Sequence, residues 1–258
     1  MDARKEIDVA ECLRRGAIGA LGAIPGTLAA HPIDLVKIRI QTGAGSIRAA
    51  MRGLGTRASD WPRYYRGLGP GVLQKAATRG PMFLASEVGT QCCETGLGLS
   101  RERALVVGSL SSGYVTGFLA ASFEWAKVQR SLGATVGSVS ARKRLAVCHG
   151  AGLRNAVFDA TFFGTEHAAR RFGNLPPEAT YALGAVAAIT LDFPLDVALK
   201  RNMAAPTTSP VPRVGATLLA FRLLRDRGFR VVFAGLGVKS CEFGVSYACT
   251  GYVSTFFR

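Results

Sequence analysis

Three long stretches without a charged side chain constrain the fold of this chain more than any other feature. Residues 16–33, 104–123 and 243–257 contain no Asp, Glu, Lys or Arg. A helix that spans a bilayer needs roughly 20 mainly apolar residues, so these stretches reach or approach spanning length. They are rich in Gly, Ala, Ser and Thr, and small residues let membrane helices approach one another closely. The stretches predict an all-α membrane protein.

The charged residues gather between the apolar stretches, and alternate connections are basic. Residues 37–66, 127–144 and 200–230 each carry five to seven Lys and Arg and at most one acidic residue. The connections near 88–103 and 170–180 are short and nearly balanced. This pattern is typical of a multi-pass membrane protein with both termini on the less basic side. A soluble helical protein with scattered basic faces is the alternative, but three basic connections on one side are hard to obtain by chance.

The net charge of the chain leaves its partner open at first. The 32 Lys and Arg against 17 Asp and Glu give +15, which could suit nucleic acid, an anionic membrane surface or acidic solutes. Basic residues interleaved with aromatic ones and zinc-ligand spacing would favour nucleic acid, and the sequence has neither. The six cysteines form no CxxC pair, so we expect reduced core residues, no metal site and no cofactor.

One motif occurs three times. HPIDLVKIRIQ at 31–41 is echoed by SFEWAKVQR at 122–130 and by PLDVALKRNM at 194–203. Each copy ends an apolar stretch and begins a basic connection, which leads to a new helix start such as YYRGLGPGVL at 64–73. A repeat of this kind predicts a repeated structural unit.

We expect three such units, each with two spanning helices. The repeats cover residues 1–98, 99–174 and 175–258. Residues 216–228, ATLLAFRLLRDRG, have the apolar spacing of a short helix lying in the membrane interface. In the middle unit, the Gly and Ser content of residues 131–148 predicts an irregular loop instead.

With these motifs the chain resembles the mitochondrial carrier family. The family pattern is Pro-x-acid-x-x-base-x-base, then a loop, then aromatic-base-Gly, three times over, and PIDLVKIR with YRG fits it fully. The resemblance implies six transmembrane helices in three pseudo-symmetric repeats around a central cavity, with short matrix-side amphipathic helices. It implies a monomeric solute carrier of the mitochondrial inner membrane that works by alternating access.

The resemblance also implies a ring of ion pairs that closes the cavity on the matrix side. In the family pattern Asp34 pairs with Lys127, and Asp196 pairs with Lys37. The third link lacks its base, because Leu199 stands at that position, and we expect Lys200 to face another way. Charges at this depth are costly in lipid unless they are paired. The implied matrix gate consists of Asp34, Lys37, Gln41, Glu124, Lys127 and Asp196, with Gln41 bracing one pair.

A second ring near the other end is weaker in this sequence. Glu87 and Arg170 could form one pair of a cytoplasmic gate. Thr90, His167 and Thr255 occupy other positions where the family has charges. The resemblance therefore implies a thin cytoplasmic gate.

Substrate contacts are implied at mid-membrane depth on the even-numbered helices. These residues are Gln74, Lys75, Arg79, Arg154, Asn155 and Glu242. Arg154 is the strongest candidate, because a guanidinium matches a carboxylate with two parallel hydrogen bonds. Its stretch, RNAVFDATFFG, is similar to carriers of oxodicarboxylates, whereas Glu242 departs from them. A carboxylate facing Arg154 would suit a zwitterion such as an amino acid, or it could pair with Lys75, Arg79 or Lys239 and leave the site positive.

Two helix starts carry implied cardiolipin sites. Tyr65, Arg66 and Gly67 form one, and Phe233 with Gly235 form the other. Free backbone N–H groups at a helix N-terminus bind anions, and the basic loops fit an anionic leaflet. Plain helix caps are the alternative reading.

Two other functions stay open at this point. Ser122 in place of a proline, Leu199 and the thin cytoplasmic ring would fit a carrier fold that has lost transport and acts as a structural or interaction protein. An enzyme is disfavoured, because His31, His149 and His167 are far apart and no catalytic pattern stands out.

Overall fold

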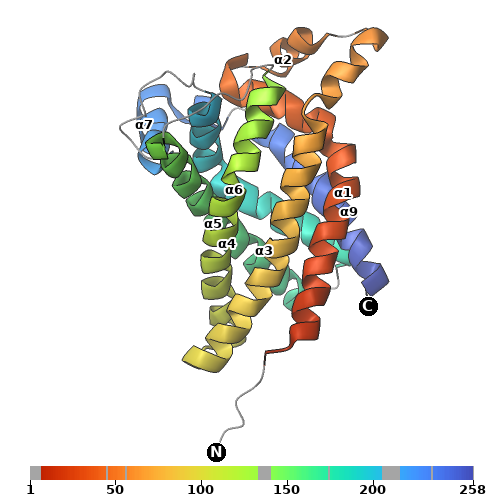
Figure 1. Cartoon of the computed structure of the whole chain (residues 1–258), viewed down its shortest axis with the longest axis vertical. Coiled ribbons are helices and arrows are strands. Elements are labelled where there is room, and N and C mark those ends of the chain that lie inside the picture. The colour runs from red at the N-terminus through yellow and green to blue at the C-terminus, as the bar shows by residue number, and fades with distance from the viewer. Residues whose placement is uncertain are drawn as a thin grey trace, which may run out of the picture.

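The computed structural model describes residues 7–44, 46–55, 57–132, 141–173, 175–204, 216–233 and 235–257 (Figure 1). This part of the chain is helical throughout, as predicted. Its six long helices are α1 (Val9–Arg39), α3 (Leu68–Leu97), α4 (Arg101–Ser131), α5 (Ala141–Phe172), α6 (Pro177–Ala204) and α9 (Leu236–Ser254). The short elements are η1 (Ile40–Ala44), α2 (Ile47–Leu54), η2 (Ala58–Tyr65), α7 (Ala216–Arg227), α8 (Phe229–Val232) and η3 (Thr255–Phe257).

The long helices form a closed ring. Each packs against the next along the chain, and α9 packs against α1 to complete the circle. The described N-terminal residues and the C-terminus lie at one end of the bundle, and α2 and α7 lie at the other, which we call the α2–α7 end (Figure 1). A ring of this kind has an interior lined by six helices, and that interior holds the site described below.

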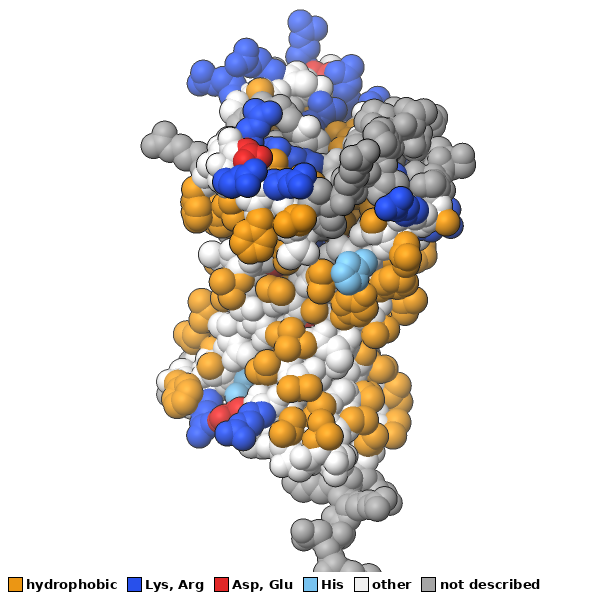
Figure 2. Space-filling model, turned by 90° about the vertical axis from the view of Figure 1, so that its left-hand side faces the viewer, with side chains coloured by type: hydrophobic (Ala, Val, Ile, Leu, Met, Phe, Trp, Pro, Cys, Tyr) orange, Lys and Arg blue, Asp and Glu red, His pale blue; other side chains and the backbone are white. Residues whose placement is uncertain are grey.

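Length and composition fit a membrane setting. By composition, α4 and α6 are apolar enough to cross a bilayer, with mean hydropathy of 1.5 and 1.7 over their best windows. The other long helices fall short partly because they carry charged residues toward the ring interior, such as Lys37 on α1 and Lys75 on α3. On the face shown in Figure 2, apolar side chains cover the middle of the bundle, and Lys and Arg gather at the α2–α7 end. This is the charge asymmetry that the sequence indicates.

Small residues allow the helices to pack closely, as the sequence predicts. A Cβ added at Gly22 of α1 would lie 2.7 Å from the Thr250 Cα of α9, and one at Gly19 would lie 2.5 Å from the Arg79 carbonyl oxygen of α3. On α4, a Cβ at Gly117 would lie 2.6 Å from the Ala151 carbonyl oxygen of α5. Larger residues at these positions would push the helices apart.

The interfacial segments are only partly as expected. The helix predicted at 216–228 is α7. The irregular loop expected at 131–148 is wrong for its second half, because α5 already begins at Ala141. Residues 133–140 lie outside the described residues. Continuation of α5 is favoured by the charged residues 142–144, which are good helix formers and end the Gly- and Ser-rich stretch.

Candidate functional site

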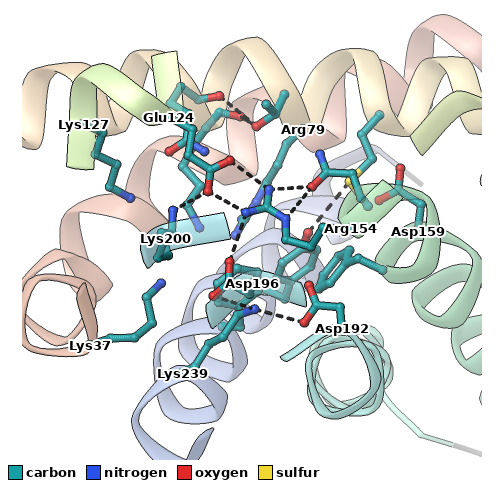
Figure 3. A pocket seen from close by; sticks show the side chains of 18 residues that line it. Lys37, Arg79, Glu124, Lys127, Arg154, Asp159, Asp192, Asp196, Lys200 and Lys239 are labelled. Atoms are coloured by element: carbon teal, nitrogen blue, oxygen red, sulfur yellow. Dashed lines mark hydrogen bonds and ion pairs between the residues drawn. The ribbon is translucent and has the colours of Figure 1, made fainter. Parts of the chain in front are cut away.

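The ring encloses a small cavity lined by side chains from all six long helices (Figure 3). Its volume is about 70 Å³, and since a water molecule needs about 10–15 Å³ on this scale, it holds only a few. Seven cations line it: Lys37, Lys75, Arg79, Lys127, Arg154, Lys200 and Lys239. Four carboxyl groups line it: Glu124, Asp159, Asp192 and Asp196. Charges buried this deeply in a membrane bundle need partners.

One ion-pair cluster joins α1 to three other helices. The Asp34 carboxylate accepts from Lys127 of α4 and lies 2.5 Å from the Nζ of Lys37. Lys37 in turn donates to Glu242 Oε2 of α9 at 2.7 Å, and Lys75 of α3 donates to Glu242 Oε1 at 3.2 Å. All five side chains are at least nine-tenths buried. The cluster therefore ties α1, α3, α4 and α9 together.

A second cluster centres on Arg154 of α5. Its guanidinium donates to both oxygens of Glu124, at 2.5 and 3.0 Å, and to Asp196 Oδ1 at 3.0 Å (Figure 3). Lys200 also contacts Glu124. Gln41 Nε2 donates to Asp196 Oδ2 at 2.8 Å. This cluster joins α4, α5 and α6 to η1, which directly follows α1.

The cluster continues from Asp196 to α9. The Nζ of Lys239 lies 3.2 Å from Asp196 Oδ2 and 3.0 Å from Asp192 Oδ1 (Figure 3). Asp192 and Asp196 are four residues apart, so they lie on the same face of α6. One lysine of α9 therefore binds two carboxylates of α6.

Arg79 differs from every other cation of the cavity. Among the described residues it has no carboxylate partner. It donates instead to the Ser246 carbonyl oxygen at 3.3 Å, to Ser246 Oγ at 2.7 Å and to Thr250 Oγ1 at 3.1 Å. Its guanidinium carbon lies 4.0 Å from the centre of the Tyr247 ring. Arg79 is thus held in place by neutral groups, and its positive charge is uncompensated.

An aromatic cluster lies on the side of the cavity that faces the termini. Phe162 has ring centroids 5.0 Å from Phe163 and 4.8 Å from Tyr247, and Phe83 stacks on Tyr181 at 5.8 Å. All five side chains are buried, and Tyr247 also lines the cavity. The cavity is therefore bounded by ion pairs toward the α2–α7 end and by aromatic rings toward the termini.

Comparison with known proteins gives one family match. A model described as mitochondrial carrier protein matches residues 9–93, which run from the start of α1 to the last turns of α3. Over these residues the chain matches the mitochondrial carrier family. The rest of the chain supplies two more pairs of long helices, α4 with α5 and α6 with α9. The first helix of each pair begins at the end of the bundle where the termini lie. No curated protein matches the chain.

The match supports a broad class. Mitochondrial carriers have six membrane-spanning helices and are transporters of solutes rather than enzymes. By the resemblance, the α2–α7 end corresponds to the expected matrix side, and the end with the termini corresponds to the expected cytoplasmic side. We use these names below.

The structure brings most of the expected matrix-gate residues together, with different pairing. The pair Asp34–Lys127 is present, and Gln41 contacts Asp196. The pair expected between Lys37 and Asp196 is wrong. Lys37 contacts Asp34 and Glu242 instead, because α9 places a carboxylate within its reach.

The third link of the gate is also different from the expectation. Lys200 does not face away, since it contacts Glu124. It is four residues after Asp196 and therefore lies on the same face of α6. Leu199 is fully buried among apolar side chains of α4 and α5.

The expected cytoplasmic pair between Glu87 and Arg170 does not form. Glu87 accepts from Arg101 at 2.9 Å and lies 3.7 Å from Arg15. Arg170 contacts Glu166 of its own helix at 2.5 Å. Arg101 starts α4 after a short turn from α3, so it reaches Glu87 more easily than a residue at the far end of α5 does.

The expected substrate residues divide into engaged and available groups. Arg154 and Glu242 are saturated by ion pairs, Lys75 is bound to Glu242, and Asn155 accepts from Arg154 at 2.6 Å. Gln74 and Arg79 remain available. The Oε1 of Gln74 is buried without a hydrogen-bond partner among the described residues.

Four functional candidates were missed or undervalued at the sequence level: Asp159, Asp192, Lys200 and Lys239. Each is an ionisable residue inside a spanning helix, and this alone is a signal of function. Asp159 is five residues after Arg154, and Asp192 is four before Asp196. Helical spacing from the expected residues could have found Asp192 and Lys200.

The two expected lipid sites lie at helix starts. Gly67 and Gly235 are the N-terminal caps of α3 and α9, with φ of 82° and 90°. Only glycine adopts this left-handed conformation without strain. The Arg66 carbonyl oxygen is bonded by His31 at 3.1 Å, and Tyr65 stacks on the same His31 ring at 6.1 Å.

Proposed function

We propose that the protein moves a small carboxylate-bearing metabolite, an oxo- or dicarboxylate or an amino acid, across the mitochondrial inner membrane. The observation that carries this proposal is the uncompensated charge of Arg79. The seven lining cations face four lining carboxyl groups, and Asp34 and Glu242 behind them bring the acids to six. The lining therefore carries a net positive charge, and Arg79 is the lining cation that has no carboxylate partner among the described residues.

Arg79 suits a carboxylate for chemical reasons. A guanidinium binds a carboxylate with two parallel charge-assisted hydrogen bonds. Its present partners are two hydroxyl groups and a carbonyl, which a carboxylate would replace with stronger bonds. Gln74, five residues before Arg79 on α3, supplies a further polar group. The side chains of Lys75, Arg154, Asn155 and Glu242 complete the proposed contacts once the ion pairs rearrange.

The two closures of the cavity support transport by alternating access. On the matrix side the ion pairs of Asp34, Lys37, Glu124, Lys127 and Asp196, braced by Gln41, join α1, α4, α5, α6 and α9. A substrate carboxylate that binds one of these lysines would draw it away from its acidic partner. The ion pairs of the gate would then weaken, because a buried charge is stable only while it is paired. On the cytoplasmic side, aromatic rings perform the closure that Glu87 and Arg170 do not provide.

We propose that cardiolipin binds at the starts of α3 and α9. Tyr65, Arg66 and Gly67 surround one start, and Phe233 and Gly235 surround the other. Free N–H groups at a helix start attract a phosphate, and the neighbouring matrix-side residues are basic. We expect the protein to work as a monomer, because one ring of six helices encloses the whole cavity.

A thermal-shift screen on purified protein in detergent with cardiolipin tests the proposal. The screen covers oxo-acids, dicarboxylates, amino acids and nucleotides. A ligand of the folded state raises its apparent stability by mass action. We expect a shift with one carboxylate class that disappears in Arg79→Gln and persists in Arg225→Gln, an exposed arginine of α7. No shift with any class, in protein that cardiolipin stabilises, would instead support a carrier fold without transport.

A further inference from the structure

The cavity holds one carboxyl group that no cation of the described chain neutralises. Asp159 of α5 is 1% exposed, and its Oδ2 is buried without a hydrogen-bond partner. The other cavity carboxyl groups, Glu124, Asp192 and Asp196, are each bound to at least one Lys or Arg. In Figure 3 no dashed line reaches Asp159, which lies apart from the cluster around Arg154. Asp159 is therefore the acidic counterpart of Arg79.

The neighbours of Asp159 are fixed by other contacts. Arg154, on the same helix, is engaged by Glu124 and Asp196. Asp192 of α6 is bound to Lys239 of α9. On α4, Gly113 lies against Asp159, since an added Cβ there would be 2.8 Å from Asp159 Oδ2, and glycine has no side chain to donate. The bundle leaves this carboxyl group without a cation while it supplies one to each of the others.

The two unmatched groups line the same cavity from different helices. Arg79 comes from α3 and Asp159 from α5, and Tyr247 of α9, which stacks on Arg79, lines the cavity with them. A buried charge without a partner is costly, and an unpaired ionisable residue inside a membrane bundle points to a functional site. Here the missing charges are one anion beside Arg79 and one cation beside Asp159.

We infer that the substrate is a zwitterion, with its carboxylate on Arg79 and its ammonium group on Asp159. This inference rests on the proposed function and narrows it to amino-acid-like molecules. A site that pairs a substrate N–H discriminates strongly against an analogue that lacks it, because the buried acceptor is then left unpaired. Asp159 is thus the residue that separates amino acids from hydroxy acids of the same size.

Matched pairs of substrates test the inference. Protein reconstituted in cardiolipin-containing liposomes is assayed for uptake of L-alanine against L-lactate and of L-aspartate against L-malate. Within each pair the molecules differ by an ammonium group in place of a hydroxyl group. We expect wild-type protein to take up at least one amino acid about tenfold or more faster than its hydroxy-acid counterpart. In Asp159→Asn this preference should fall close to one, and in the matched control Asp226→Asn, an exposed residue of α7, it should stay at the wild-type value.

The outcomes separate this inference from the proposed function. Equal or faster uptake of lactate or malate by wild-type protein would overturn the zwitterion and leave a carboxylate carrier standing. An unchanged preference in Asp159→Asn would overturn the role of Asp159. No uptake of any of the four acids would overturn the inference, while the thermal-shift screen with oxo-acids would still test the carrier proposal. The wild-type ratio decides the substrate class even where Asp159→Asn fails to fold.

Discussion

Arg154 and Glu124 face each other as a fork, with the guanidinium donating to Glu124 Oε1 at 2.5 Å and to Oε2 at 3.0 Å. The pair joins α5 to α4 inside the ring, and both side chains are almost fully withdrawn from solvent. The family pattern assigns Arg154 to substrate binding, whereas in this structure Arg154 links α5 to α4.

Arg154→Ala should therefore destabilise the protein. Removing one partner of a buried ion pair leaves an uncompensated charge, which typically costs about 3–5 kcal/mol. Here both Glu124 and Asp196 would lose a donor. Thermal unfolding in detergent with cardiolipin measures the effect, with Arg225→Ala of α7 as the control. A melting temperature equal to that of the wild type would contradict the stabilising role of the Arg154–Glu124 ion pair.

Leu199→Lys should lower stability, although a base at this position fits the family pattern. Leu199 is fully buried beside Trp125 and Val128, and Glu124 already has two cations. A new ammonium group would be buried without a partner, which costs several kcal/mol in an apolar setting. The comparison with Leu199→Met in the same unfolding assay separates charge from shape. A lysine variant more stable than the wild type would show that the matrix gate is incomplete.

Gly22→Ala should separate α1 from α9. Its added Cβ would meet the backbone of Thr250 at 2.7 Å, and backbone atoms cannot move aside cheaply. Overpacking of this kind costs about 1–3 kcal/mol. Gly164→Ala of α5 is the matched control, since nothing lies within 4 Å of its added Cβ and removal of a helical glycine gains about 0.5–1 kcal/mol. If the two variants had the same melting temperature, the close approach of α1 and α9 would not be a determinant of stability.

Phe162→Ala should weaken the cytoplasmic closure. Phe162 contacts four other aromatic rings of the cluster and is fully buried. Loss of a buried phenylalanine side chain costs about 3–5 kcal/mol, and Phe162→Leu should cost much less because it retains most of the volume. Accessibility of a cysteine placed at Gln74 to a membrane-impermeant thiol reagent measures opening, in a background without the native cysteines. Equal labelling in both variants would mean that the aromatic cluster does not close the cavity.

The sequence predicted the elements of this fold better than the partners within the site. Charge-free stretches and basic connections were enough to predict spanning helices and the basic end, because both patterns follow from the bilayer itself. The pair Asp34–Lys127 was implied by the resemblance to the carrier family. The choice of Glu242 over Asp196 as the partner of Lys37 did not, because it depends on which of several carboxylates the packing of α9 brings closest.

Two further features depend on three-dimensional packing. The isolation of Asp159 becomes visible only when the partners of Arg154 and Lys239 are known. The aromatic cluster gathers Phe83, Phe162, Phe163, Tyr181 and Tyr247 from four helices, with no common spacing in the sequence. Single-residue motifs carry no information on such convergence.

Uptake of radiolabelled small carboxylates and amino acids into cardiolipin-containing liposomes tests the central claim most directly, with wild-type protein compared with Arg79→Gln and with Arg225→Gln. Charge-assisted hydrogen bonds are worth about 1.5–3 kcal/mol each, so loss of the guanidinium should lower uptake at least about tenfold. The account predicts uptake by the wild type and the α7 control, and loss of uptake in Arg79→Gln of unchanged fold. Uptake by Arg79→Gln at the wild-type rate, or no uptake by the wild type, would contradict it.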